Sequence, residues 1–300
     1  MNRKSLRFRV VDILLIAMMI LPLVAGMAIK ILTTPASEGL EITGSRIYFT
    51  IPMPIQDLPI TESQVNSWLV IISILGLCLF MVHGIAVKPQ SKRQLLAEWV
   101  VEKTNHLVED NMGQRFMAFA PFAAAVMALS AFSSLMSLVG LRAPTADMNV
   151  VAGWAILCFA LITHYKLKGG VWPYVKGFFD PIPVFAPFNI IGELATPVSM
   201  SFRHYGNVLS GAVISTLIAY ALQNLSKMLL GWLPGVLGDI PFLQIGLPAV
   251  LSLYFDIFSG LMQAFIFAIL TMLYIANGFP EDLYQQRQER KARKRALHSA

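Results

Sequence analysis

The sequence predicts an all-α integral membrane protein with about six membrane helices and one amphipathic helix on the cytoplasmic side. Of its 300 residues, 56% are hydrophobic and 13% are charged, and the mean hydropathy is +0.64. An average soluble domain carries about 25% charged residues. Apolar runs of about 20 residues, long enough to span a hydrocarbon core, recur along the chain. The net charge of +6 does not indicate nucleic acid, because the basic residues lie in short loops and tails, where they set topology and contact lipid.

Six segments are expected to span the membrane: 10–32, 68–87, 116–139, 150–165, 188–223 and 247–278. The first follows a basic start, which is typical of a signal peptide. Its length favours a retained helix, with a cleaved signal as the alternative. Pro197 is expected to kink the fifth segment.

We divide the chain into an N-terminal membrane helix (1–33), an external loop (34–67), a membrane domain (68–278) and a basic cytoplasmic tail (279–300). In the external loop, apolar and polar residues alternate around Gly44 and Ser45, which predicts a short hairpin with its turn there.

Charges between the spans set the topology. Residues 88–115 carry apolar side chains on one side of a predicted helix, which either lies on the membrane surface or docks another subunit. The segments 1–9, 88–115, 164–177 and 281–300 hold 18 of the 23 Lys and Arg residues. Six alternating spans place all four segments on one side, so the positive-inside rule predicts that both termini are cytoplasmic.

Arg203 is the candidate functional residue that stands out most, because it lies in the middle of a long apolar segment. Between 188 and 230 the only other formal charges are Glu193 and Lys227. An arginine at membrane depth costs about 2.5–3.5 kcal/mol on insertion scales and generally faces a partner or a wet cavity. The alternative is a structural arginine, either paired inside a helix bundle or snorkelling from a helix end. Steps of three or four residues predict one polar helix face, made of Ser199, Arg203, Asn207, Ser210, Gly211 and Ile214.

Three stretches resemble the subunit a family of the rotary ATP synthases. The stretch PVSMSFRHYGNVLSG at 197–211 is similar to the arginine signature of that family. QAFIFAILTMLY at 263–274 resembles its last helix, and PTADMN at 144–149 resembles its mid-chain loop. The three stretches occur in the order of the family, and the resemblance covers roughly 60–278.

The resemblance implies an ion-translocating stator that performs no bond chemistry itself. Its partners would be the c-ring, the b subunits of the peripheral stalk and membrane lipids, in the plasma membrane of a bacterium. Each c subunit of such a ring carries a membrane-buried carboxylate, and Arg203 would favour the ionised form of that carboxylate and block leakage between two aqueous half-channels. The last two helices would be long and strongly tilted against the ring.

Four further residues are assigned to ion translocation by the same resemblance. Asn207 and Gln263 would be neutral polar partners near Arg203. Asp256, seven residues before Gln263 and on the same face as Gly260, Gln263 and Phe267 by α-helical counting, would be a relay in the outer half-channel. Glu193 is the second relay candidate. Some relatives carry Glu or His at the position of Ala212. Because alanine cannot act as a polar relay, Asp256 would take over that role here.

Two other functions are compatible with part of the sequence. A secondary transporter would use Arg203 to bind an anionic substrate, but we find no internal repeat of the kind that such transporters contain. A membrane enzyme would need clustered His, Asp or Cys, whereas the five histidines are scattered. Cys78 and Cys158 form no motif, so we expect no metal, cofactor or disulfide. The choice between H⁺ and Na⁺ stays open.

Overall fold

Helices make up nearly all of the structure, a computed structural model that describes residues 3–33, 44–54, 56–87, 91–232, 242–244 and 246–289. The longer helices are α1 (Arg3–Thr33), α2 (Glu62–Val82), α3 (Lys92–Met112), α4 (Ala120–Leu135), α5 (Met148–Leu167), α7 (Ala186–Leu230) and α10 (Gly260–Gly278). The shorter ones are α6 (Val171–Gly177), α9 (Leu247–Ser252), the 3₁₀ turns η1 (Gln114–Phe119), η2 (Met136–Val139), η3 (Pro144–Ala146), η4 (Pro183–Phe185) and η5 (Phe242–Gln244), and the π-helical segment η6 (Leu253–Ser259).

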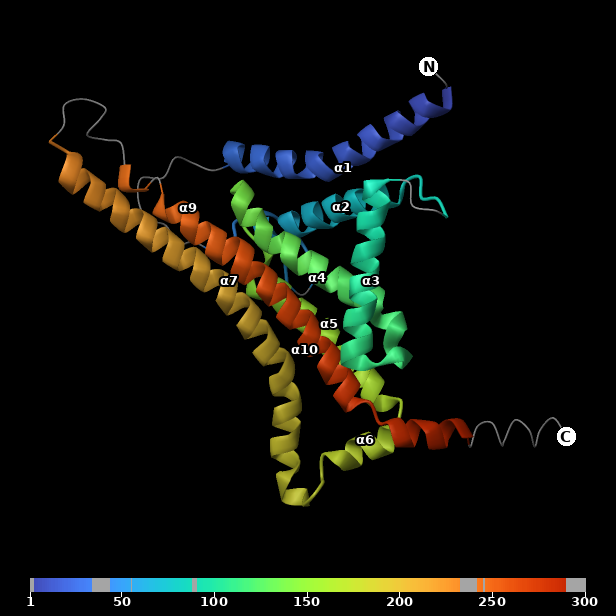
Figure 1. Ribbon diagram of the computed structural model, residues 1–300. Helices are drawn as coiled ribbons and strands as arrows, with labels where there is room; N and C mark the ends of the chain where they lie inside the picture. The colour runs from blue at the N-terminus through green and yellow to red at the C-terminus, as the bar shows by residue number, and fades with distance from the viewer. Residues whose placement is uncertain are drawn as a thin grey trace.

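Six of the described helical segments are long and apolar enough to cross a membrane. They comprise α1 from Phe8, α2, η1 to η2, α5, η4 to α7, and α9 to α10. The all-α membrane fold is therefore confirmed. The fifth span is longer than expected, since α7 continues to Leu230. In Figure 1, α7 bends along its length, and it contains Pro197 in its interior.

The long helices α7 and α10 run side by side along one edge of the molecule (Figure 1). On the other side, α1 packs along α2, and α3 passes from the end of α2 to the start of α4. Side-chain caps start three helices: Thr61 Oγ1 accepts from Gln64 N, Ser91 Oγ accepts from Gln94 N, and an Asp147 carboxylate oxygen accepts from Asn149 N.

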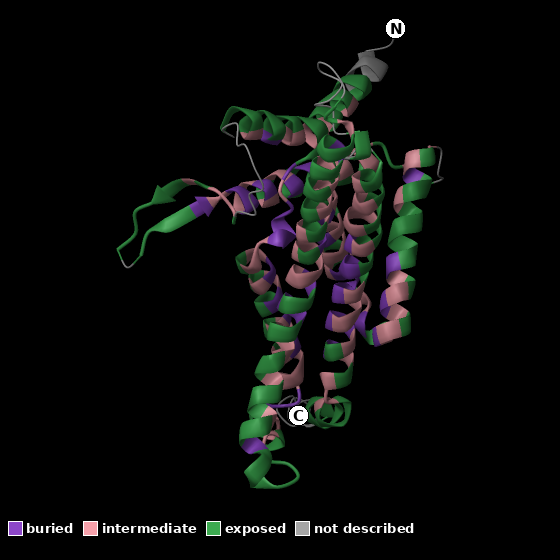
Figure 2. Cartoon of the chain, turned by 90° about the vertical axis from the view of Figure 1, so that its left-hand side faces the viewer, coloured by how far each residue is buried: buried purple, intermediate pink, exposed green. Residues whose placement is uncertain are grey.

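Buried residues lie along the middle of the bundle, and exposed residues cover its outside (Figure 2). The largest core cluster joins α3, η1, α4, α5 and α10 through Val108, Met112, Phe116, Phe119, Ala120, Ala123, Ile162, Met272 and Ile275. A second cluster joins α5, α7 and α10 through Ala155, Cys158, Met200 and Phe267. Thus α7 touches the core along one side, and much of the remaining helix is exposed.

The segment between α1 and α2 contains a described β-hairpin. Strands β1 (Ile47–Ile51) and β2 (Leu58–Thr61) pair antiparallel, and the chain turns between them, in a proline-containing segment. The first strand of the hairpin predicted around Gly44 and Ser45 lies in 34–43, outside the described residues, so that hairpin stays a prediction. Pro52 and Pro54 suit the turn between β1 and β2, because proline cannot donate to a strand ladder and favours turns.

Candidate functional site

Arg203 lies on the exposed side of α7. The next residue, His204, points into the bundle. Successive residues of an α-helix are about 100° apart, so the burial of His204 directs Arg203 outward. His204 is 0% exposed, its Nε2 lies 3.2 Å from Ser130 Oγ, and its ring meets Trp154 and Phe267 edge-on. Within the described part of the chain, Arg203 has no hydrogen-bond or ion-pair partner. Packing of His204 therefore holds the guanidinium outward, free to meet another group.

Asn207, one turn after Arg203, fastens α7 to the start of α10. Its Oδ1 accepts a hydrogen bond from Ser259 Oγ at 2.8 Å, and its Nδ2 donates to the Ser259 carbonyl at 3.3 Å. Gln263 lies one turn further along α10 and is buried. No described hydrogen bond joins Asn207 or Gln263 to Arg203. The structure therefore brings Asn207 to α10 and leaves Arg203 unpaired.

Asp256 lies in η6, where the helix is π rather than α. A π-helix bonds residue i to i+5, so counting Asp256 and Gln263 as two α-helical turns apart is wrong here. Gly260, Gln263 and Phe267 are buried together, whereas Asp256 is only partly buried. The hydroxyls of Ser252 and Ser137 are its polar neighbours. Asp256 faces the turn that follows α4, and Gly260 lies against Ser134 at the end of α4.

A cavity of about 400 Å³ lies beside Asp256, and we call it the Asp256 cavity. Its walls come from the end of α1, the connection between α4 and α5, the 208–216 stretch of α7, and η6. Two cations, Lys30 and Arg142, line it together with the Asp256 carboxylate. The hydroxyls of Ser137, Ser215 and Thr216 complete a polar lining on which water and small ions can be bound.

Glu193 lies toward the other end of α7 and is ion-paired. Lys166 Nζ donates to both carboxylate oxygens at 2.7 Å, and the Tyr174 hydroxyl donates to Oε1 at 3.3 Å. Burial, and then the negative charge of Glu193, raise the pKa of the Tyr174 phenol, which therefore keeps the proton that it donates. Pro197 lacks the N–H that would bond the Glu193 carbonyl, so a backbone acceptor is also freed here.

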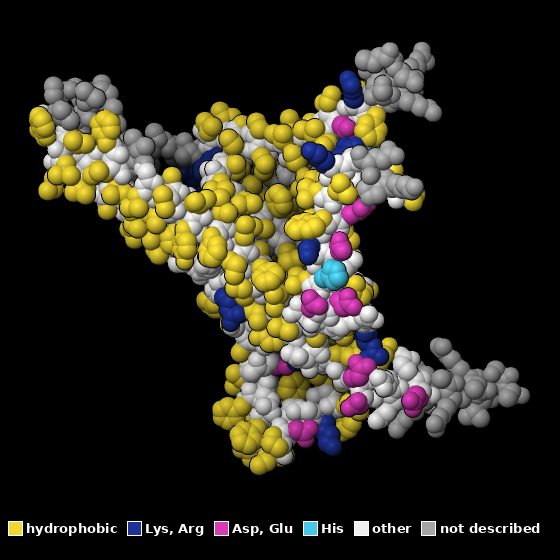
Figure 3. Space-filling model, in the orientation of Figure 1, with side chains coloured by type: hydrophobic (Ala, Val, Ile, Leu, Met, Phe, Trp, Pro, Cys, Tyr) yellow, Lys and Arg dark blue, Asp and Glu magenta, His cyan; other side chains and the backbone are white. Residues whose placement is uncertain are grey.

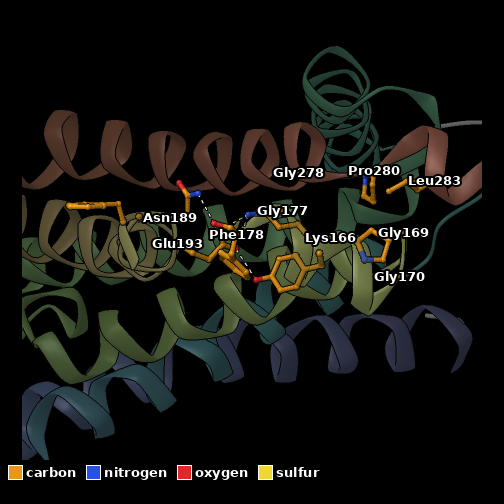
Figure 4. Close-up of a pocket in the computed structure, with 14 residues that line it drawn as sticks. Lys166, Gly169, Gly170, Gly177, Phe178, Asn189, Glu193, Gly278, Pro280 and Leu283 are labelled. Carbon is orange, nitrogen blue, oxygen red and sulfur yellow. Dashed lines mark hydrogen bonds and ion pairs between the residues drawn. The ribbon is translucent and has the colours of Figure 1, made fainter. Parts of the chain in front are cut away.

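A second cavity, of about 470 Å³, surrounds this ion pair and is called the Glu193 cavity (Figure 4). The C-terminal ends of α5 and α10, helix α6 and the first turns of α7 form its walls. In Figure 4, Glu193 and Lys166 point toward one another across the cavity, and Asn189 lies beside them. Gly169, Gly170 and Gly177 line the α6 side of the cavity; they have no side chain, which lets Pro280 pack directly on Gly169.

The two cavities follow one another along α7, with Arg203 between them. The Glu193 cavity reaches α7 residue 193, and the Asp256 cavity begins at 208. At 1.5 Å per residue, Arg203 lies about 15 Å from Glu193 and about 8 Å from the level of Val208 along the helix axis. Neither cavity is lined by Arg203.

The surface around Arg203 is largely apolar. Figure 3 shows hydrophobic side chains covering most of the face made by α7 and α10, whereas acidic side chains gather over α3 and near the C-terminal end. A cation on such a face is poorly solvated at membrane depth. This face is therefore suited to a partner that brings an anionic group into an apolar interface.

Sequence reasoning missed several residues of this site. Ser259 and Ser137 are small hydroxyls in apolar runs and carry no signal of their own. Lys166 and Tyr174 lie in a segment whose charges we used only for topology. Their pairing with Glu193 depends on the packing of α5 and α6 against α7, which the sequence does not specify.

Known proteins resemble this chain over most of its length. The sequence profile of the family described as ATP synthase A chain matches residues 65–276, which include Arg203, both cavity carboxylates and η6. The chain belongs to this family.

Individual relatives agree with this membership. The sodium ion specific ATP synthase subunit a of Propionigenium modestum is 26% identical, covering 81% of this chain and 88% of that one. ATP synthase subunit a of Acidothermus cellulolyticus is 33% identical over 68% of this chain and 71% of its own, and that of Bacillus pumilus is 29% identical over 69% and 86%. The family and the six spans make this a multi-pass membrane protein of ATP synthesis and ion transport.

Proposed function

We propose that this chain is the ion-translocating stator subunit of an F-type ATP synthase, in which Arg203 separates two aqueous half-channels and couples the flow of H⁺ or Na⁺ to rotation of a c-ring. The observation that carries the proposal is the order of the site along α7. The Glu193 cavity, the exposed Arg203 and the Asp256 cavity follow one another, and Arg203 belongs to neither cavity.

The proposed mechanism depends on the cost of charge in lipid. A ring carboxylate crosses lipid only when it is neutralised, because a bare charge there is costly. On meeting Arg203 the carboxylate ionises and releases its ion, and the permanent guanidinium charge prevents cations from leaking between the half-channels. Asn207 and Gln263 would orient the guanidinium, and each translocated charge is driven by about 2.3 kcal/mol per 100 mV.

The orientation of the half-channels follows from the basic segments. With these segments in the cytoplasm, both termini and the Glu193 cavity face inward, and the Asp256 cavity opens to the outside. Asp256 would then receive ions from outside, and Glu193 would pass them to the cytoplasm. The proposed location is the plasma membrane of a bacterium, and the proposed partners are the c-ring, the b subunits and lipids.

The transporter hypothesis has less support. A substrate anion held by Arg203 would need a cavity that includes the guanidinium, and neither of the two cavities described above does. The family match also covers the whole segment that suggested this alternative. We therefore retain only the stator function.

ATP-driven proton pumping in inverted vesicles tests the proposal. Arg203→Ala should abolish pumping while the amount of assembled complex stays normal, because exposed side chains without partners change stability by about 0.5 kcal/mol or less. Lys227→Ala, which removes an exposed cation from the same helix, is the matched control and should pump normally. Pumping that survives in Arg203→Ala would refute the assignment.

A further inference from the structure

Helix α1 lies outside the part of the chain that matches the family, yet it is closely docked on α2. A Cβ atom on Gly76 of α2 would lie 2.9 Å from the backbone nitrogen of Met19, so the two backbones almost touch at this point. Nearer the C-terminal end of α1, a Cβ on Gly26 would lie 2.7 Å from the side chain of Leu69. Such close contacts of small residues hold membrane helices together in a defined register.

The N-terminal half of α1 is fixed by charged and aromatic contacts. Asp12 Oδ1 lies 2.9 Å from both His83 Nδ1, at the end of α2, and Arg93 Nη1, at the start of α3. The Phe8 ring stacks on His83 at a centroid distance of 4.4 Å. With both halves anchored, the last turn of α1 has a defined position.

That last turn carries Lys30, whose ammonium group donates to the Gly140 carbonyl in the connection between α4 and α5. Lys30 also lines the Asp256 cavity. An element absent from the family match therefore contributes a basic side chain to the cavity that holds Asp256. The hydrogen bond to Gly140 explains the position of Lys30. The effect of the Lys30 charge on ions depends on the other charged groups that face Lys30.

Two cations and two carboxylates surround Lys30, so that Lys30 itself makes the lining of the two cavities net positive. Arg142 and Asp256 share the Asp256 cavity with it, and a smaller adjoining cavity of about 140 Å³ brings further titratable groups to its other side: Arg46, Tyr48 and Glu62. Burial, and then the charge of Glu62, raise the pKa of the Tyr48 phenol, which is therefore neutral at physiological pH. Three cations thus face two carboxylates, and Lys30 and Arg142 are the two cations that reach the Asp256 cavity.

We propose that Lys30 sets the concentration of the coupling cation inside the Asp256 cavity, as an electrostatic filter supplied by the N-terminal helix. This inference rests on the proposed function, in which the Asp256 cavity receives ions from outside. A spherical cavity of 400 Å³ is about 9 Å across. At that distance, a positive unit charge lowers the local concentration of monovalent cations about two-fold when the effective dielectric constant equals that of water, and about five-fold when it is half that of water.

ATP synthesis by the whole enzyme in proteoliposomes tests this, with the outer face of the chain toward the lumen and with a fixed membrane potential. The synthesis rate is measured against luminal pH, or against luminal sodium if the wild type responds to sodium. Lys30→Met and Lys30→Gln should reach half-maximal rate at about two- to five-fold lower cation concentration, which is about 0.3–0.7 units higher in pH. The shift should shrink at high luminal salt, because exposed charges are screened.

Controls separate the charge from the hydrogen bond and from net charge. Lys30→Gln keeps a donor for the Gly140 carbonyl, and Lys30→Arg keeps the charge and should behave as wild type. Lys227→Met removes a cation from the same end of the helix bundle outside the cavity and should leave the half-maximal concentration unchanged. A purely structural Lys30 would lower the amount of complex or the maximal rate in both neutral variants without moving the half-maximal concentration, and that result would overturn the proposal.

Failure of this proposal can be told from failure of the stator function. If Arg203→Ala abolishes synthesis while Lys30→Met and Lys30→Gln keep the wild-type half-maximal concentration, only the role of Lys30 is refuted. If Arg203→Ala synthesises ATP normally, the stator function itself fails, and the inference about Lys30 fails with it.

Discussion

At Gly211, α7 lies close against η6, and we expect that enlarging this residue will separate the two. A Cβ atom there would lie 3.0 Å from Cβ, Cγ and Cδ1 of Phe255, the residue before Asp256. Carbon atoms in contact prefer about 3.5–4.0 Å, and the Phe255 Cβ is bonded directly to the backbone, so no side-chain rotation can move it away. Gly211→Ala should therefore cost about 1–3 kcal/mol of overpacking, offset by the gain of about 0.5–1 kcal/mol that alanine brings to a helix.

The matched control is Gly206→Ala on the same helix, where nothing lies within 4 Å of an added Cβ. Both substitutions gain the same helix propensity, so their difference isolates the contact and should be about 1–3 kcal/mol. In a Cys78→Ser background, a thiol-reactive dye reports unfolding of the purified chain through the buried Cys158. Gly211→Ala should melt below Gly206→Ala by about 2–4 °C per kcal/mol. Equal melting temperatures would refute the close packing of α7 on η6.

Two further predictions concern the hydrogen bonds between Asn207 and Ser259 and the two cavities. Asn207→Ala should cost about 1–3 kcal/mol in the same melting assay, because Ser259 loses both of its hydrogen bonds to α7. Ser210→Ala loses only a hydrogen bond within its own helix and should cost less. Equal costs would contradict a stabilising role of the Asn207–Ser259 hydrogen bonds. In a cysteine-free chain, Thr216→Cys in the Asp256 cavity should react with an impermeant thiol reagent only from outside. Asn189→Cys in the Glu193 cavity should react only from the cytoplasm. Labelling of both variants from the same side would contradict the two half-channels.

The membrane fold and Arg203 could be predicted because both depend on patterns within single segments. Apolar runs long enough to span a membrane predict the helices. A single arginine inside such a run indicates a functional residue, because a charge at membrane depth is costly. The resemblance to the family then added Asn207, Gln263, Asp256 and Glu193. None of these inferences needed to know which helix packs against which.

The rest of the site depends on contacts between distant segments. The π-helical turn around Asp256 cannot be predicted from an apolar stretch that is equally compatible with an α-helix, so the α-helical spacing assumed there does not apply. The pairing of Lys166 with Glu193 joins residues 27 apart in the chain, and the contact of Lys30 with Gly140 joins residues 110 apart. A sequence pattern within one helix contains no information about such pairs, which is why the cavities appeared only in the structure.

The packing of His204 explains why Arg203 can be functional without being structural. The inward face of α7 carries Met200, His204 and Gly211, all buried, and these contacts fix the rotation of the helix about its axis. Arg203 adds no described contact to this fixation, yet it is the residue whose charge is least compatible with lipid. The proposed function requires that other residues fix the helix and that Arg203 stays unpaired, because the guanidinium has to exchange one ring carboxylate for the next without the helix moving. A counter-charge within the chain would stabilise Arg203 and compete with the ring, so an unpaired arginine held outward by a buried neighbour is the arrangement that permits rotation.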